Sequence, residues 1–242
     1  MYLGAPCVVP SAVRVPRIWV GPDALLGIGG LVGRDVTEAE VRTAIVTAAK
    51  LAVKWLLKAA GSLKRPRPGA IAGEPMRLRF REAFGTGPEF VPSWRPAGQK
   101  WDRGDVVRAR LLCAAKILSN GSIDFFAFGP RACPFDFDWR PSTWALVAHN
   151  VYAVCLGERF WKAWKDGDGN SLAATLLHES LHIYFDTVRD AGDRGPYGLA
   201  ACYERFVLPT NGIALPDYVK RNCESGIPAG DFPVVPGTRA YA

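Results

Sequence analysis

The amino-acid sequence predicts an α+β fold, in which a small antiparallel sheet packs with helices. Three observations lead to this prediction. A helical segment follows residue 37, runs rich in valine, isoleucine and phenylalanine occupy the middle of the chain, and helical periodicity returns after residue 157. A parallel α/β fold would instead alternate strands with helices. The 242 residues are enough for one large domain or two small ones.

The first helix is expected to begin at Thr37 and to end near Gly61. Thr37 and Glu40 form a capping box, in which the hydroxyl and the carboxylate satisfy each other's free backbone N–H groups. Apolar residues then recur along one helical stripe, with basic residues between them: Val41, Ile45, Ala48, Ala52, Trp55, Leu56 and Ala59. Proline, glycine and arginine predict loops from 61 to 98, apart from a short extended piece at 76–80.

The strands are predicted in two pairs. Residues 106–118 and 123–128 are rich in β-prone side chains and flank Asn120-Gly121, a dipeptide that favours the tight turn of a β-hairpin. Residues 144–149 and 151–156 are two more apolar, β-prone runs, which turn at Asn150. The middle of the chain is therefore expected to form the antiparallel sheet.

Helical patterns follow at residues 158–165, 171–186, 199–208 and 215–223. The acidic loop 166–170 is similar in composition to a calcium-binding loop. Ser171 and Leu177, however, occupy the positions of the turn glycine and the bidentate glutamate, which excludes an EF-hand. Asn170 or Ser171 is expected to cap the helix that follows.

The most informative segment is H-E-x-x-H, formed by His178, Glu179 and His182 within an apolar helical run. Residues four apart share one face of a helix, so both imidazoles can bind one zinc ion at about 2.0–2.1 Å. Glu179 lies beside the pair, where its carboxylate can take a proton from a metal-bound water. Random placement would produce the motif in roughly one such sequence in a thousand. His149 is expected to be an ordinary sheet residue.

A catalytic zinc ion needs a third protein ligand and one open position for water. The chain after His182 contains no further histidine and no cysteine before Cys202, so the candidates are carboxylates. They are Asp186, Asp190, Asp193 and Glu204. The first of these lies one turn beyond the histidine pair, whereas the next two follow the helix, where the chain can turn back. Spacing alone leaves the choice open.

The segment from His178 to Cys202 resembles the deuterolysin and lysine-specific metalloendopeptidase family, the aspzincins. That family pairs H-E-x-x-H with G-T-x-D-x-x-Y-G, whose aspartate is the third zinc ligand and whose tyrosine stabilises the oxyanion. Residues 191–198 here read Ala-Gly-Asp-Arg-Gly-Pro-Tyr-Gly. The Gly-Thr start is not kept, and three residues rather than two separate Asp193 from Tyr197. The resemblance implies Asp193 as the ligand, with Asp190 as the alternative.

The resemblance also implies a zincin-like metalloprotease fold over residues 37–225, with an N-terminal extension or cap at 1–36 and a C-terminal tail at 226–242. Six cysteines, even in number and far apart, suit up to three disulfides; the alternative is six buried thiols. The family's closing helices imply a disulfide between Cys202 and Cys223. A second pair, Cys133 with Cys155, is suggested by the family's strand before its short helix.

These residues together predict a zinc-dependent endopeptidase that acts on proteins or peptides. His178, His182 and Asp193 would hold Zn²⁺, Glu179 would be the general base, and Tyr197 would donate a hydrogen bond to the oxyanion. Two alternatives keep the zinc site. One is an effector or toxin domain that hydrolyses bacterial cell-wall peptides and has an inhibitor or immunity protein as partner. The other is a catalytically silent metal-binding domain.

The net charge is +7, from 30 basic and 23 acidic residues. The basic residues between 58 and 81 lie in a stretch broken by proline and glycine, which predicts a solvated linker rather than a nucleic-acid interface. A general attraction to an anionic cell surface or wall fits this charge.

No apolar run is long enough for a transmembrane segment, and no secretory signal is visible at the start of the sequence. Disulfides then imply that the protein is secreted after removal of a leader, or exported as part of a larger secretion polypeptide.

Overall fold

A computed structural model describes residues 7–12, 14, 16–64, 73–91, 98, 100–129, 133–135, 139–148, 152–185, 188 and 196–224. The chain divides into two compact units. Unit 1 comprises Met1–Val8, Lys54–Ala114 and Tyr184–Ala242, and unit 2 comprises Val9–Val53 and Ala115–Ile183. The elements are mixed α and β, as predicted, with one small sheet in the described part of the chain.

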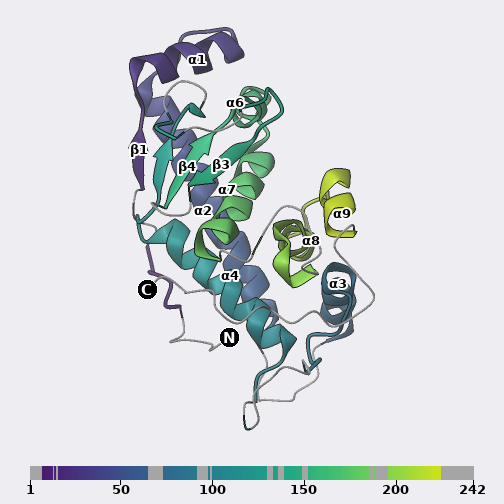
Figure 1. The fold of residues 1–242 in the computed structure, drawn as a ribbon. Coiled ribbons are helices and arrows are strands. Elements are labelled where there is room, and N and C mark those ends of the chain that lie inside the picture. Colours follow the sequence, from purple (N-terminus) through teal and green to yellow (C-terminus); the bar gives the residue numbers. More distant parts are fainter. Residues whose placement is uncertain are drawn as a thin grey trace. The chain divides into compact units, whose positions relative to one another are not determined.

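The sheet belongs to unit 2 and is mixed rather than antiparallel, which corrects the prediction (Figure 1). Its strands are β1 (Arg17–Trp19), β2 (Asp124–Phe126), β3 (Ala145–Ala148) and β4 (Ala153–Leu156), in the spatial order β1-β2-β4-β3. β2 pairs in parallel with both β1 and β4, and only β3 and β4 are antiparallel. The predicted strands at 144–156 are thus confirmed, while their turn lies outside the described residues.

One face of this sheet is buried and carries Ile18, Phe125 and Val154, which are aligned in register across three strands. β1 and α1 (Pro22–Val32) come from the segment that was expected to form an N-terminal extension. Both lie in unit 2, and α1 contacts α6 (Glu158–Lys165).

The predicted hairpin at 106–128 is wrong, because residues 106–118 lie within helix α4 (Arg103–Ser119). Its buried apolar residues recur at helical spacing: Val106, Val107, Leu111, Ala114, Ala115 and Leu118. Val106 and Val107 are β-prone, so a short window of this run resembles a strand, although the length of the whole run is that of a helix. Asn120-Gly121 does form a turn, with Gly121 at φ 77°, but this turn follows the helix.

The extended piece expected at 76–80 is also helical, within α3 (Glu74–Phe84). Pro75 in the first turn favours a helix start, and Gly85 ends the helix with a φ of 74°. Phe80, Ala83 and Phe84 form the buried face. The alternation of arginine with apolar residues over five positions was too short to distinguish a strand from a helix.

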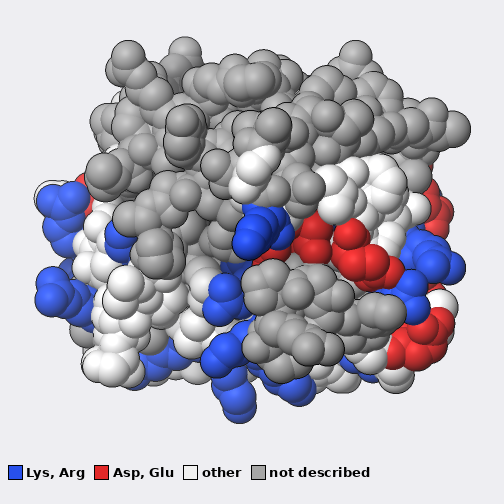
Figure 2. Space-filling view, turned by 90° about the horizontal axis from the view of Figure 1, so that it is seen from below, with Lys and Arg blue, Asp and Glu red and all other residues white. Residues whose placement is uncertain are grey.

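Part of the basic stretch therefore lies on a helix rather than in a linker. Arg77 of α3 forms an ion pair with Glu89 at 2.7 Å. On the face shown in Figure 2, basic side chains are spread over several parts of the described surface, whereas acidic side chains gather in fewer places.

The predicted capping box is confirmed at the start of α2 (Glu38–Ser62). The Thr37 backbone N–H donates to Oε2 of Glu40 at 2.8 Å, and the Glu40 N–H donates to the Thr37 hydroxyl at 3.2 Å. These bonds satisfy donors that a helix start leaves without an internal partner. The Thr37 hydroxyl also donates to the Glu40 carboxylate. The two bonds that this carboxylate accepts, from the backbone N–H and the hydroxyl of Thr37, lower the pKa of Glu40.

The helices expected after residue 157 are confirmed as α6, α7 (Gly169–Tyr184), α8 (Ala200–Thr210) and α9 (Asp217–Glu224). A 3₁₀ helix, η2 (Pro196–Gly198), precedes α8. The cap of α7 is Asp168 rather than Asn170 or Ser171, because the helix begins two residues earlier than predicted. The Asp168 carboxylate accepts a hydrogen bond from the Ser171 N–H at 3.0 Å.

All six cysteines form disulfides, so the buried-thiol alternative is wrong. Both pairs implied by the resemblance are present: Cys133–Cys155 in unit 2 and Cys202–Cys223 in unit 1. The third disulfide joins Cys7 to Cys113 across 106 positions of sequence within unit 1. Among the described residues, no helix has both the length and the apolar character needed to cross a membrane.

Candidate metal-binding and catalytic residues

Helix α7 carries the H-E-x-x-H motif and is almost entirely buried. Its buried apolar residues lie on every side of the motif: Leu172, Ala173, Ala174, Leu176, Leu177, Leu181 and Ile183. The Asp168 cap at its start and this apolar surface explain why the segment is helical. The motif is therefore held on a rigid, packed element of unit 2 rather than on a loop.

His178 and His182 lie on one face of α7, as their spacing predicts. Their ring centroids are 4.7 Å apart and the ring planes are at 73° to each other. His182 is 7% exposed and His178 is half-buried. Two imidazoles this close on a rigid helix are placed as two ligands of one metal ion would be.

Glu179 is also buried, with 7% of its surface exposed. Moving an ionised carboxylate away from water is costly unless hydrogen bonds, an opposite charge or a metal ion compensate for the loss. A glutamate in an apolar helix next to two histidines is therefore typical of a functional group rather than of the hydrophobic core.

The described residues supply some, but not all, of the protein ligands that a zinc ion needs. Imidazole nitrogen is a preferred zinc ligand, and α7 supplies two of them. In the part of the chain that the structure describes, no group of three or more His, Cys, Asp or Glu side chains is placed to hold a metal ion. A zinc site on α7 would need a third ligand from outside the described residues.

The carboxylates expected for that role are Asp193 and its alternative Asp190. Both lie outside the described residues, as does Asp186. Glu204 belongs to α8 in unit 1 and is 2% exposed. The assignment of Asp193, or of Asp190 in its place, as the third zinc ligand therefore stays a prediction.

Tyr197 lies on η2 in unit 1, and its ring is buried between two side chains. Phe84 stacks on it with a centroid distance of 5.0 Å and an interplanar angle of 11°. The guanidinium carbon of Arg103 lies 4.1 Å from the ring centroid. The Tyr197 hydroxyl shares a hydrogen bond with the Thr86 hydroxyl at 2.7 Å.

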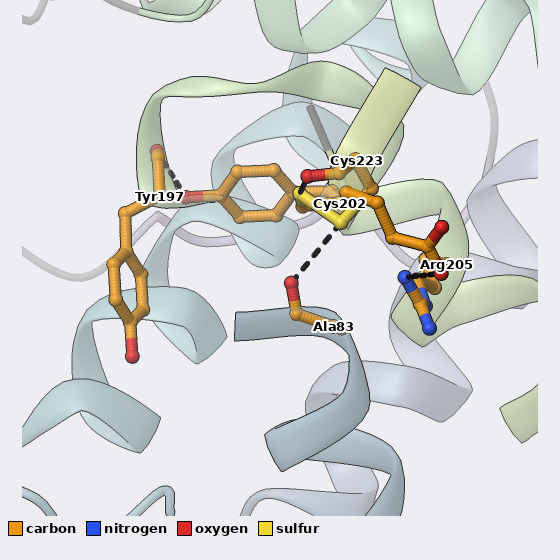
Figure 3. The surroundings of a disulfide bond; sticks show 7 residues. Ala83, Tyr197, Cys202, Arg205 and Cys223 are labelled. Atoms are coloured by element: carbon orange, nitrogen blue, oxygen red, sulfur yellow. Dashed lines mark hydrogen bonds and ion pairs between the residues drawn. A yellow bond between two sulfur atoms is a disulfide. The ribbon is translucent and has the colours of Figure 1, made fainter. Parts of the chain in front are cut away.

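The backbone of Tyr197 is fixed as well. Its carbonyl oxygen accepts hydrogen bonds from Nη1 of Arg110 and, at 3.1 Å, from the Tyr203 hydroxyl. Figure 3 shows the second bond beside the Cys202–Cys223 disulfide, with Sγ of Cys223 3.2 Å from the Ala83 carbonyl oxygen. We call Phe84, Thr86, Arg103, Arg110, Tyr197 and Tyr203 the Tyr197 cluster.

Burial raises the pKa of Tyr203, while the positive charges of Arg110 and Arg103 act in the opposite direction. The hydroxyl of Tyr203 therefore stays protonated and keeps its hydrogen bond to the Tyr197 carbonyl over the physiological pH range.

Sequence reasoning missed Thr86, Arg103 and Arg110. One signal was available for the arginines: they are seven residues apart, which places both on one face of α4. That signal depends on recognising the segment as a helix. Thr86 carries no signal, because 111 positions separate it from Tyr197.

No family model, no curated protein and no solved structure matches this chain.

Proposed function

We propose that this protein is a zinc-dependent hydrolase that cleaves peptide bonds. The observation that carries the proposal is the pair of histidine rings 4.7 Å apart on α7, with the buried Glu179 between them in sequence. The spacing and the helix both match what H-E-x-x-H chemistry requires. The resemblance to the aspzincins supports the same assignment.

His178 and His182 would hold the zinc ion, with Asp193, or Asp190 in its place, as the third ligand. When bound, zinc polarises a carbonyl oxygen and lowers the pKa of a water molecule toward neutrality. Glu179 acts as general base, accepts a proton from the attacking water on its carboxylate and delivers it to the leaving amine. Tyr197 donates a hydrogen bond to the oxyanion.

The burial of α7 supports this role for Glu179. Electrostatic interactions weaken with the dielectric constant, so a carboxylate shielded from bulk water acts more strongly on a nearby proton or positive charge. The apolar side chains of α7 also limit the access of solvent to the carboxylate.

The decisive experiment compares wild type with Glu179→Gln on a mixture of unfolded proteins in the presence of zinc. Product termini are read by mass spectrometry, and bound zinc is measured by elemental analysis. We expect wild type to cleave and Glu179→Gln to bind one zinc ion per chain but lose nearly all turnover, because glutamine cannot accept the proton. Equal cleavage by both proteins would refute the base assignment.

A second candidate substrate is the peptide of a bacterial cell wall. The net charge of +7 favours attraction to an anionic wall, and three disulfides favour an oxidising compartment reached by secretion or export. An inhibitor or immunity protein would then be a partner. Digestion of purified muropeptides beside the protein mixture distinguishes the two substrates, and zinc binding without cleavage of either indicates a silent metal site.

A further inference from the structure

We propose that Asn120 is an acceptor site for an N-linked glycan, which is attached while the chain passes through an oxidising secretory compartment. Asn120, Gly121 and Ser122 form the acceptor triplet N-x-S, whose middle residue is not proline. The inference goes beyond the proposed hydrolase, because it needs neither zinc nor the residues of α7. All of the residues that carry it belong to unit 2, at the turn that joins α4 to β2.

The sequence offers a single candidate for this modification. The chain contains five asparagines, and only Asn120 has a serine or threonine two positions later. Such a triplet also arises by chance, so the exposure and geometry of the turn decide whether it can act as an acceptor.

The turn presents the triplet to solvent. Ser122 is exposed and Asn120 is partly exposed, whereas the flanking residues Ser119 and Ile123 are buried, with 0% and 1% of their surface accessible. Gly121 has a φ of 77°, a left-handed conformation that glycine favours at the end of a helix. A glycan is bulky and hydrophilic, and a short surface turn anchored on both sides can carry one without disturbing the core.

The side chain of Asn120 uses its oxygen within the turn and leaves its nitrogen available. Oδ1 accepts a hydrogen bond from the Ser122 backbone N–H at 2.9 Å, which forms an Asx turn. Nδ2 has no hydrogen-bond partner in the described structure, and it is not among the buried polar atoms that lack one. This nitrogen therefore reaches solvent, and it is the atom to which an N-linked glycan is attached.

The sugar comes from a donor outside this chain, an oligosaccharide carried on a lipid pyrophosphate. Nδ2 forms a bond to the anomeric carbon of the first sugar. The bond from that carbon to the pyrophosphate oxygen breaks, its electron pair leaves with the lipid pyrophosphate, and the proton lost by Nδ2 passes to a base of the transferase. The three disulfides favour the oxidising compartment in which such transfer takes place.

The test secretes the full chain, behind a cleavable leader, from a eukaryotic host that makes glycoproteins. The protein is treated with peptide N-glycosidase in heavy-oxygen water, and the peptide that contains Asn120 is read by mass spectrometry beside an untreated sample. The heavy label separates release of a glycan from spontaneous deamidation, to which an Asn-Gly pair is prone. We expect a glycan on Asn120 in most chains, and none on Asn170, an exposed asparagine with Leu172 two positions later.

Two substitutions remove the acceptor but keep the turn. Asn120→Asp retains the oxygen that accepts the Ser122 bond and lacks the amide nitrogen, and Ser122→Ala retains the backbone N–H and lacks the hydroxyl. Both should be secreted with their disulfides formed and with complete loss of the glycan. Ser122→Thr should keep the glycan, because threonine also completes the triplet. Asn170→Gln is the matched control and should carry the glycan as wild type does.

Secreted wild type without a glycan on Asn120, or a glycan that persists in Ser122→Ala, would overturn the proposal. Chains retained inside the secretory compartment are recovered from the cells and mapped in the same way, so poor secretion does not hide either result. Glu179→Gln should carry the same glycan as wild type whatever its activity, so this inference and the proposed function can fail independently.

Discussion

The motif on α7 in unit 2 and the Tyr197 cluster in unit 1 are built in different ways. On α7, two histidines and a glutamate come from five consecutive residues, and the period of the helix alone brings the rings to 4.7 Å. Around Tyr197, the partners come from separate segments, and Thr86 is 111 positions away in sequence. A local arrangement survives most changes elsewhere, whereas the cluster depends on the packing of α3, α4, η2 and α8.

The largest effect is expected from the metal ligands on α7. His178→Ala or His182→Ala should lower zinc affinity at least about a hundredfold. Loss of a residue that only hydrogen-bonds to a metal ligand already costs about ten- to a hundredfold, and loss of a ligand itself should cost more. Competition with a chromophoric chelator measures this affinity. His149→Ala, which changes the third histidine, is the control and should bind zinc as wild type does. If His149→Ala loses zinc equally, the ligand pair has been misassigned.

Next comes the packing of the Tyr197 cluster. Phe84→Ala removes a side chain that is 1% exposed and contacts the rings of Phe80, Tyr197, Tyr203 and Phe206. The free energy of unfolding should fall by about 3–5 kcal/mol, measured by urea denaturation. Leu78→Ala on the same helix, 47% exposed, should change it by less than about 0.5 kcal/mol. Similar effects of the two would contradict the burial of this cluster.

The third zinc ligand is the part of the proposed metal site that α7 does not supply, and its candidates follow α7 in the sequence. Asp193→Ala should lower zinc affinity by about ten- to a hundredfold and leave the fold intact. Asp190→Ala is the matched variant three residues earlier. The same chelator competition decides between them, and a loss confined to Asp190→Ala moves the assignment to that residue.

The smallest effect is expected at the capping box of α2. Thr37→Ala should reduce stability by about 1 kcal/mol at neutral pH, measured by thermal unfolding. Because the Thr37 hydrogen bonds lower the pKa of Glu40 below its usual 4.5, the ionised carboxylate stabilises the fold above that pH. The bond from the Thr37 hydroxyl to the carboxylate weakens as the pH falls through the lowered pKa, so the variant and wild type should differ less in acid than at neutral pH, while the Glu40 N–H bond to the Thr37 hydroxyl keeps a residual difference. A constant difference from pH 7 to 3 would contradict this linkage.

Elements with a strong helical period or a cap were predicted well. α2 begins at its capping box, and α6 spans the predicted residues. The hairpin error at α4 arose because Val106 and Val107 are β-prone residues in a helix that is buried on several sides. β1 has three residues and carries too little alternation to be recognised, whereas a strand was predicted at 123–128, where β2 lies, but not its parallel pairing.

The amino-acid sequence was sufficient to place His178, Glu179 and His182 together, because residues four apart on a helix share a face whatever surrounds them. The partners of Tyr197, the Cys7–Cys113 disulfide and the parallel pairing of β1 with β2 became visible only in the folded chain. Apart from the bond between Tyr203 and Tyr197, each of these joins segments about a hundred positions apart. Such contacts depend on how all the intervening elements pack, and no local pattern of residues records that packing.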